Sequence, residues 1–278
     1  MAKLIDGKAI AAAVRREVQD AVATRAAQGA PPSLVAVQVA DDAASDLYVR
    51  RQERSCAKLG IAFQRLRLPS DATEGRLLDE LAALNERGDV TGIILQMPLP
   101  AHINPRVARR GLAPDKDVEG VHPENLGWLL SGRTTRVPPT AAAALACIES
   151  TGVQLEGAEA VVIGHSETVG KPVALLLMER LATVTVAHHA THDVAAHTTR
   201  ADVVVVAVGK PGLVTASMIK PGAVVVDVGI NEVEQEDGST IVVGDVDASV
   251  ADQAGWLSPV PGGVGPVTVA MLMRNATK

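Results

Sequence analysis

Aromatic side chains are nearly absent from this chain of 278 residues, in which one Tyr, one Phe and two Trp make up 1% of the sequence. Surfaces that bind single-stranded nucleic acid stack the bases on several aromatic rings, so no such surface is expected here. The formal net charge is -6, and no block of Lys or Arg interrupts the acidic balance. Both features predict that nucleic acid is not a partner.

Cysteine is equally scarce, with only Cys56 and Cys147, which lie far apart in apolar helical patterns. Such usage fits a reducing compartment and does not fit a disulfide framework. No apolar run is long enough to span a membrane. The first six residues turn polar too soon for a signal peptide. Together these absences predict a cytoplasmic protein without a membrane partner.

Hydrophobic residues, in contrast, make up 47% of the chain, enough for one large core or two modest cores. Short Val-rich runs that are typical of strands alternate with helical patterns. This order predicts an α/β fold with a parallel sheet covered by helices on both faces. The expected strands are residues 33–39, 63–68, 90–95, 159–163, 183–187, 203–206 and 223–228. The expected helices run from residue 6 towards 29 and over 43–59, 73–87, 140–150, 172–178 and 267–275.

Residues 115–139 break this alternation, since they are loop-like and the surrounding sequence has prolines at 114, 123, 138 and 139. Domain boundaries fall in such segments, so the chain is expected to divide here. The second half then repeats the alternation and resembles a compact Rossmann-type domain.

The stretch 161–172 has the most specific local pattern in the second half. An apolar run ends at Gly164, a small polar turn extends to Gly170, and Pro172 opens a helical pattern. Glycines allow close approach of a ligand to the backbone, and free N–H groups at a helix start attract anions. The spacing is not that of the usual dinucleotide fingerprint. Two interpretations therefore stay open, a phosphate-binding turn and a plain tight turn between strand and helix.

Seven motifs occur in an order that resembles the bifunctional methylenetetrahydrofolate dehydrogenase/cyclohydrolase (FolD) family. They are Ile-Asp-Gly-Lys at 5–8, Ala-Ser with Tyr-Val at 44–49, Gln-Met-Pro-Leu-Pro at 96–100, Lys-Asp-Val-Glu-Gly at 116–120, Val-Gly-Lys-Pro-Gly at 208–212, Asp-Val-Gly-Ile-Asn at 227–231, and the proline- and glycine-rich run at 259–266. The resemblance covers nearly the whole chain.

The resemblance implies two α/β domains with a cleft between them. Residues 1–139 with 264–278 would form the N-terminal folate-binding and catalytic domain, and residues 140–263 the C-terminal Rossmann-type domain that binds NAD(P). The implied activity is oxidation of 5,10-methylenetetrahydrofolate by hydride transfer to the coenzyme, followed by hydrolysis of the methenyl product. The implied partners are one-carbon derivatives of tetrahydrofolate and a second copy of the chain, without a metal.

The resemblance also implies site residues. The catalytic positions are Tyr48, Gln52, Gln96 and Glu119. Substrate contacts would come from Tyr48, Gln96, Glu119, Pro261, Gly262 and Gly263. Coenzyme contacts would come from Gly164, His165, Ser166, His189, Val208, Gly209 and Ile230. The structural alternatives are core packing for Tyr48, a strand-end cap for Gln96, and a simple turn for the two glycines at 262 and 263.

Three positions depart from the family pattern. Gln52 stands where the family has a lysine, Glu119 keeps the charge of an aspartate on a longer arm, and Pro139 and Ala141 flank Thr140. A lysine can exchange protons near neutral pH, whereas a glutamine amide can only donate and accept hydrogen bonds. We therefore predict a dehydrogenase with weak or absent cyclohydrolase activity. A fully bifunctional enzyme, a binding homologue without turnover, and an unrelated two-domain dehydrogenase acting on a hydroxy or amino acid remain as alternatives.

The choice of coenzyme rests on the histidines. The family often has arginine where this chain has His165, and Ser-Arg where it has His189 and Ala190. No acid ends the strand at 183–187, although an NAD enzyme would usually have one. Charged imidazoles could bind a phosphate, so NADP is predicted, with NAD possible. The spacing of His188 and His192 could suggest a metal site, but no Cys or acidic partner lies nearby.

Overall fold

The computed structural model describes residues 1–278 except 41, 42, 236 and 237, and only the backbone at 43–45, 47 and 48. The chain forms two compact units. The six-stranded unit contains Met1–Ala12 and Pro138–Met271, and the three-stranded unit contains Ala13–Val137 and Leu272–Lys278. A parallel sheet organises each unit, so the predicted two-domain α/β class is confirmed. The functional division at residues 139 and 263 and the cleft stay predictions.

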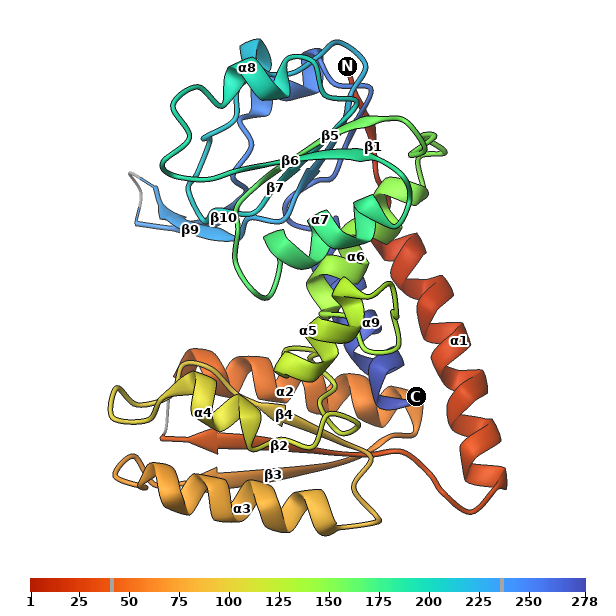
Figure 1. The fold of residues 1–278 in the computed structure, drawn as a ribbon, viewed down its shortest axis with the longest axis vertical. Helices are drawn as coiled ribbons and strands as arrows, with labels where there is room; N and C mark the ends of the chain where they lie inside the picture. The colour runs from red at the N-terminus through yellow and green to blue at the C-terminus, as the bar shows by residue number, and fades with distance from the viewer. Residues whose placement is uncertain (41–42, 236–237) are drawn as a thin grey trace. The chain divides into compact units, whose positions relative to one another are not determined.

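The sheet of the three-stranded unit has β2 (Ser33–Val39) at its centre, flanked by β3 (Ala62–Leu68) and β4 (Gly92–Leu95). Both pairings are parallel and lie within two residues of the predicted strands. Figure 1 shows α2 (Ala43–Leu59) and α3 (Glu74–Glu86) on opposite faces of this sheet. This arrangement is the covered parallel sheet that the alternating pattern predicted.

Helix α3 shows how the sequence determines this packing. The Thr73 side chain accepts a hydrogen bond from the Arg76 backbone N–H at 3.1 Å, which caps the first turn. Leu77, Leu81 and Leu84 follow at intervals of four and three residues and are all buried. They pack in one cluster with the valines of β2, because this spacing places them on one face of the helix.

The prediction that residues 115–139 form a loop was wrong in part, because α5 (Pro123–Leu130) lies within them. Pro123 occupies the first turn, where a proline breaks no helical hydrogen bond. The His122 side chain accepts a hydrogen bond from the Glu124 N–H at 3.1 Å and caps the helix. The short helix α4 (Pro105–Arg110) also begins with a proline and was not predicted.

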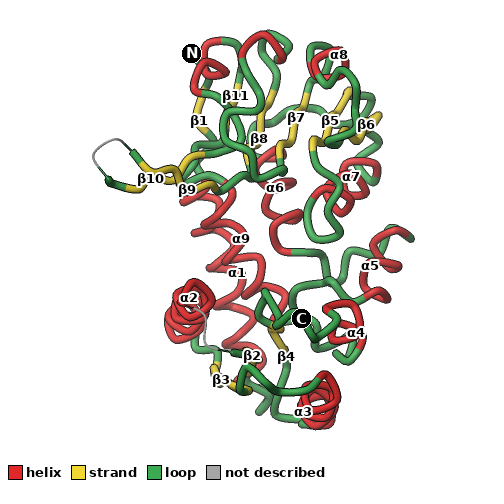
Figure 2. Tube along the Cα trace, turned by 90° about the vertical axis from the view of Figure 1, so that its left-hand side faces the viewer, coloured by secondary structure: helices red, strands yellow, loops and turns green. Residues whose placement is uncertain are grey.

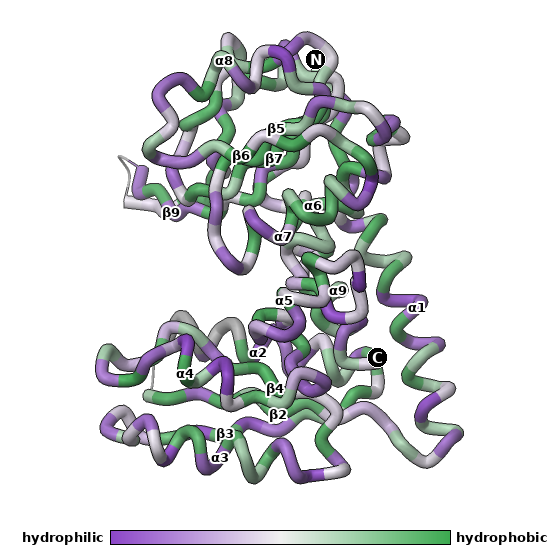
Figure 3. Tube along the Cα trace, in the orientation of Figure 1, coloured by the Kyte–Doolittle hydropathy of each residue, from purple (hydrophilic) through white to green (hydrophobic). Residues whose placement is uncertain are grey.

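The sheet of the six-stranded unit has the order β1-β11-β8-β7-β5-β6, and every pairing is parallel. Four of its strands lie within one residue of the predicted bounds. They are β5 (Glu159–Ile163), β6 (Thr183–Ala187), β7 (Val203–Val206) and β8 (Val224–Asp227). Figure 3 shows hydrophobic colouring along β5 and β7, as expected for strands buried on both faces. The two-residue strands β1 (Lys3–Leu4) and β11 (Trp256–Leu257) are too short to have been predicted.

The helices of this unit are α6 (Pro139–Glu149), α7 (Gly170–Met178) and the short α8 (Ala195–Thr198), with 3-10 turns at Ala216–Met218 and Ala248–Asp252. An antiparallel hairpin, β9 (Asn231–Glu234) and β10 (Thr240–Val243), was not predicted. Helices α1 (Gly7–Ala27) and α9 (Val264–Ala276) contribute residues to both units. In the part of the chain that the structure describes, no helix is long and apolar enough to cross a membrane.

Candidate functional site

One edge of the six-stranded sheet collects the residues predicted to bind the coenzyme and three of those predicted to bind the substrate. The strands are parallel and lie side by side in Figure 2, so their carboxyl ends meet at the same edge. Ligands bind at this edge in open α/β sheets. The predicted residues follow directly: Gly164, His165 and Ser166 after β5, His189 after β6, Val208 and Gly209 after β7, Ile230 after β8, and Pro261, Gly262 and Gly263 after β11.

The turn between β5 and α7 is tightly packed. A Cβ atom on Gly164, whose φ is +121°, would lie 2.3 Å from the Ala207 carbonyl oxygen. A Cβ on Gly170 would lie 2.0 Å from the Gly164 carbonyl oxygen. The Ser166 hydroxyl accepts a hydrogen bond from the Val169 N–H at 3.1 Å. Close packing of backbone on backbone therefore explains why glycine stands at both positions and why their spacing differs from the usual fingerprint. Helix α7 begins at the second of these glycines.

Three histidines gather beside this turn. The ring centroids of His165 and His188 lie 5.2 Å apart, those of His165 and His189 6.0 Å apart, and those of His188 and His189 5.8 Å apart. All three side chains are exposed. They meet because β5 and β6 pair in register, with Ile163 opposite Ala187. Among the described residues, no group of three His, Cys, Asp or Glu side chains is placed to hold a metal ion.

In the three-stranded unit, the structure brings two of the predicted catalytic residues together. Gln96 follows β4 and is buried, and its Nε2 donates a hydrogen bond to Oε1 of Gln52 on α2 at 2.9 Å. Tyr48 lies four residues before Gln52 on the same helix, but its side chain is outside the described part. The two amides therefore form a direct pair at the carboxyl edge of the three-stranded sheet.

In the motif at 116–120, Lys116 and Asp117 hold the loop in place through hydrogen bonds to other parts of the chain. Lys116 Nζ donates hydrogen bonds to the carbonyl oxygens of Leu84, Asn85 and Arg87 at 3.1, 2.6 and 2.7 Å. The buried Asp117 accepts hydrogen bonds from the His122 N–H at 2.7 Å and from Asn125 Nδ2 at 2.9 Å. Glu119, which is partly buried, takes no part in these contacts and stays the residue of this motif that is predicted to bind the substrate.

Glu119 has an unusual acidity. Desolvation by burial, assisted by the negative charge of Asp117, raises its pKa to about 7, against the opposing effect of Arg109. At neutral pH this carboxyl group is therefore only about half ionised. The expectation that Glu119 simply keeps the charge of the family's aspartate is thus correct only at higher pH.

Two buried acids of the six-stranded unit were missed as functional candidates. Asp227 is 3% exposed and Asp245 is fully buried, and both accept hydrogen bonds from the loops at the carboxyl edge. Asp227 opens the motif at 227–231, which was a usable signal. Asp245 stands between glycine and valine with no motif around it, so its partners appear only in the fold.

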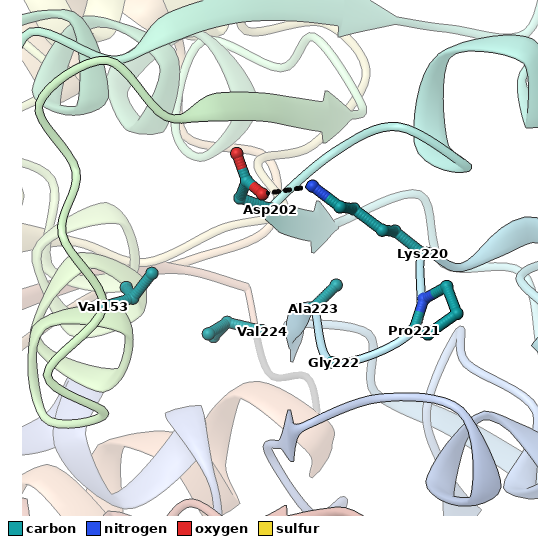
Figure 4. A pocket seen from close by; sticks show the side chains of 7 residues that line it. All are labelled: Val153, Asp202, Lys220, Pro221, Gly222, Ala223 and Val224. Carbon is teal, nitrogen blue, oxygen red and sulfur yellow. Dashed lines mark hydrogen bonds and ion pairs between the residues drawn. The ribbon is translucent and has the colours of Figure 1, made fainter.

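A recess lies at the opposite edge of the six-stranded sheet, away from the residues predicted to bind a ligand. It lies where β7 and β8 begin, and Figure 4 shows it beside the ion pair of Asp202 and Lys220, whose oxygen and nitrogen lie 2.6 Å apart. None of the residues predicted to bind a ligand lines it.

Comparisons with known proteins agree over the full length. The family model described as the tetrahydrofolate dehydrogenase/cyclohydrolase catalytic domain matches residues 5–119, and the model of the NAD(P)-binding domain of the same family matches residues 138–278. The bifunctional protein FolD of Rhodobacter capsulatus is 48% identical over 99% of this chain and 92% of its own length. FolD 2 of Mesorhizobium japonicum is 47% identical over 98% of this chain and 90% of its own length.

Solved structures give the same result. The bifunctional FolD enzyme of Campylobacter jejuni has a TM-score of 0.95 and 37% identity, covering all of this chain and 98% of its own. The enzyme of Trypanosoma brucei, solved with NADP and an inhibitor, has a TM-score of 0.91 and 38% identity, covering 99% and 96%. With both family domains matched and relatives near half identical along its length, the chain belongs to the tetrahydrofolate dehydrogenase/cyclohydrolase (FolD) family.

Proposed function

We propose that this chain oxidises 5,10-methylenetetrahydrofolate by hydride transfer to NADP, and that its methenyltetrahydrofolate cyclohydrolase activity is weak or absent. The dehydrogenase follows from membership of the family and from the NAD(P)-binding domain at residues 138–278. The observation that carries the second part is the direct hydrogen bond between the amides of Gln96 and Gln52. The family resemblance implies a lysine at position 52 beside Gln96, and this chain has Gln52 there instead.

The two reactions make different demands on the protein. In hydride transfer the bound nicotinamide accepts the hydride, and the protein supplies binding and orientation. The Gln52–Gln96 pair is suited to orientation, because each amide can donate and accept hydrogen bonds. Hydrolysis adds water to the substrate and moves protons, which the Gln52 amide cannot carry. A positioned acid–base group contributes about 10²- to 10⁴-fold to such a step, so its loss should affect hydrolysis selectively.

Full bifunctionality is a second candidate function, and one observation favours it. With its pKa raised to about 7, Glu119 is a group of this unit that can take up and release a proton near neutral pH. In this alternative, Glu119 would serve the hydrolysis in place of the missing lysine. The two candidates assign the activity to different residues and can therefore be separated by substitution.

The decisive measurement is the decay of the methenyl chromophore with wild type, Gln52→Lys and Glu119→Gln. The first candidate expects slow wild-type hydrolysis and a rise of about 10²-fold or more in Gln52→Lys. Fast wild-type hydrolysis that disappears in Glu119→Gln would support the second candidate and reject the first. Gln19→Lys, the same exchange at an exposed position of α1, is the matched control. Absorbance of the reduced nicotinamide, measured in parallel, separates either enzyme from a binding homologue without turnover.

The coenzyme assignment is supported by the carboxyl edge of the six-stranded sheet. The turn after β5 directly precedes α7, and the positive end of the α7 helix dipole at this point favours a pyrophosphate. His165, His188 and His189 stand at the ends of β5 and β6, where a Rossmann-type domain holds the adenosine ribose. Three imidazoles and no carboxylate directly after β6 fit a 2′-phosphate better than a free 2′-hydroxyl. We therefore assign NADP as the preferred coenzyme.

The cellular setting follows the family. We propose a homodimer that works in the cytoplasm on one-carbon derivatives of tetrahydrofolate. The two free cysteines, Cys56 and Cys147, are both buried, and burial raises the pKa of each thiol to about 12, so the chain is suited to a reducing compartment. Light scattering after size-exclusion chromatography would test the dimer, and a monomeric mass at micromolar concentration would reject it.

A further inference from the structure

Two buried carboxylates connect the loops at the carboxyl edge of the six-stranded sheet. Asp245, two residues after β10, accepts hydrogen bonds from the backbone N–H groups of Val208, Gly209 and Lys210 at 2.8, 3.0 and 2.8 Å. Its Oδ1 also accepts a hydrogen bond from Asn231 Nδ2 at 2.9 Å. Four donors fill the acceptor positions of one carboxylate, so Asp245 has no capacity left to act on a substrate.

Asp227, the last residue of β8, also accepts hydrogen bonds from the backbone of neighbouring loops. Its Oδ1 accepts hydrogen bonds from the N–H groups of Gly229 at 2.9 Å and Asp245 at 3.0 Å, and its Oδ2 accepts one from Val246 at 2.9 Å. Its own N–H donates to Ser258 Oγ at 2.8 Å, just before the loop that leads to Gly262. Asp227 thus joins the loops after β8 and β11 to the segment that carries Asp245.

Two glycines make room for these carboxylates. A Cβ on Gly229 would lie 2.3 Å from both Cγ and Oδ1 of Asp245, and a Cβ on Gly244 would lie 1.8 Å from Oδ2 of Asp227. Neither distance is compatible with a side chain. The sequence therefore keeps a glycine against each acid, and the two acids and two glycines form one built unit, which we name the aspartate clamp (Asp227, Gly229, Gly244 and Asp245).

The aspartate clamp determines what the neighbouring loop can bind. Three consecutive backbone N–H groups pointing to one centre form an anion-binding nest. Here the nest at 208–210 is already occupied by the carboxylate of Asp245, so it is not the phosphate site. The phosphates are left to the turn after β5, and the loops after β7 and β8 are left for an uncharged or weakly charged part of the ligand.

The side chains that these pinned loops present are apolar. Val208 is 37% exposed and Ile230 is 59% exposed, although both are hydrophobic. The Val208 N–H donates a hydrogen bond to Asp245. On either side of Ile230, the Gly229 N–H donates to Asp227, and the side-chain amide of Asn231 donates to Asp245. A single exposed apolar residue is ordinary, but here buried acids fix two of them, on the loops that follow the paired strands β7 and β8.

We propose that Asp227 and Asp245 are positioning residues for the coenzyme, which fix the loops at 208–210 and 228–231 so that Val208 and Ile230 form an apolar seat for its nicotinamide end. This inference rests on the proposed function, because it takes the dinucleotide to lie along this edge. Neither acid touches the reacting atoms. Their contribution is to reduce the freedom that the two loops lose when the coenzyme binds.

The test compares two probes by calorimetry, NADP and 2′-phospho-ADP-ribose, which lacks the nicotinamide. Asp245→Asn keeps the shape but places an NH2 group against backbone donors, so one or two charge-assisted hydrogen bonds are lost. The expected result is an NADP Kd raised about tenfold or more, with the Kd of 2′-phospho-ADP-ribose changed by less than about twofold. The KM of the folate substrate should stay unchanged while the KM of NADP rises.

Gly229→Ala is a second variant that keeps the charge of Asp245 and displaces its carboxylate, and it should give the same pattern. If either variant does not fold, Asn231→Ala removes one donor to Asp245 and tests the same loss at smaller size. Asp202→Asn, at the opposite edge of the sheet, is the matched control and should bind both probes like wild type.

The outcomes separate the two proposals. Equal NADP affinity in wild type and in every folded clamp variant overturns the positioning role and leaves the dehydrogenase proposal intact. An equal loss of affinity for both probes also overturns it, because a general structural defect would do the same. Failure of the wild-type chain to bind NADP or NAD would overturn the proposed function and, with it, this inference.

Discussion

The carboxyl edges of the two sheets use their polar groups in different ways. At the six-stranded edge, Asp227 and Asp245 bond to the chain's own backbone and leave exposed glycine, histidine and apolar positions for a ligand. At the three-stranded edge, Gln52 and Gln96 bond to each other, and Glu119 has a raised pKa. We propose that the first edge binds the coenzyme mainly through its fixed loops, and that the side chains of the second edge take part in the chemistry. Substitutions should therefore change affinity at one edge and reaction rate or pH dependence at the other.

The largest effect is expected from Gly170→Ala. The new Cβ would lie 2.0 Å from a backbone oxygen that cannot move without shifting the whole turn. Such a shift would displace the proposed pyrophosphate site, so NADP affinity should fall by about 10- to 100-fold, which corresponds to roughly 1.4–2.7 kcal/mol, while affinity for a folate analogue is retained. Calorimetry with both ligands measures the split. Gly127→Ala, whose Cβ would meet open space within α5, is the control. Unchanged NADP binding in Gly170→Ala would show that this turn is not part of the coenzyme site.

The sequence predicted the seven longer strands of the two parallel sheets, β2 to β8, and most helices, because their apolar runs are continuous and end at Gly, Pro or Asp. It did not predict β1 and β11, since a two-residue strand has no periodicity and forms only because the neighbouring β8 offers an edge. Helix α5 was not predicted because proline usually breaks a helix, whereas Pro123 lies in the first turn of this one. For the site, motif order predicted Gln52, Gln96 and Glu119. The raised pKa of Glu119 and the partners of Asp245 depend on contacts distant in the chain, which no local pattern contains.

The second largest effect concerns stability and comes from Glu119→Gln. In the folded chain the pKa of Glu119 is raised from 4.5 to about 7, so its ionised form is disfavoured by folding. The contribution of this group to the free energy of unfolding is present below pH 4.5 and is lost as pH rises through about 7. The variant cannot ionise and should therefore be about 1–3 kcal/mol more stable than wild type at pH 8. Near pH 4.5 the two should be equal.

Urea unfolding at pH 4.5 and pH 8 measures this difference. Glu124→Gln, the same exchange at an exposed position of α5, serves as the control and should show no such pH dependence. A stability difference that does not change between the two pH values would mean that the Glu119 carboxyl is not desolvated, and would remove the main support for Glu119 as a proton carrier.

A smaller effect is expected when the carboxyl edge of the six-stranded sheet loses one imidazole. His189→Ala removes one donor from the trio with His165 and His188, so the affinity for NADP should fall by about tenfold. NAD lacks the 2′-phosphate and should be affected little. The ratio of the two dissociation constants is the quantity to measure, with His192→Ala as the exposed control on the same loop. Equal losses for NADP and NAD would place the trio away from the 2′-phosphate.

The smallest effect is expected at the edge that carries no predicted ligand residue. Asp202 forms an ion pair with Lys220 at 2.6 Å and accepts a hydrogen bond from the Glu159 N–H at 3.0 Å, and its side chain is 37% exposed. These contacts lower its pKa, chiefly through Lys220, so its stabilising contribution is present above its usual pKa and is lost as pH falls. Because exposed ion pairs contribute about 0–1 kcal/mol, Asp202→Asn should lower the free energy of unfolding by no more than about 1 kcal/mol at pH 7. NADP affinity should not change. A loss of coenzyme affinity in this variant would contradict the expected division of the sheet into a binding edge and a structural edge, because Asp202 lies at the opposite end of the strands from the predicted coenzyme residues.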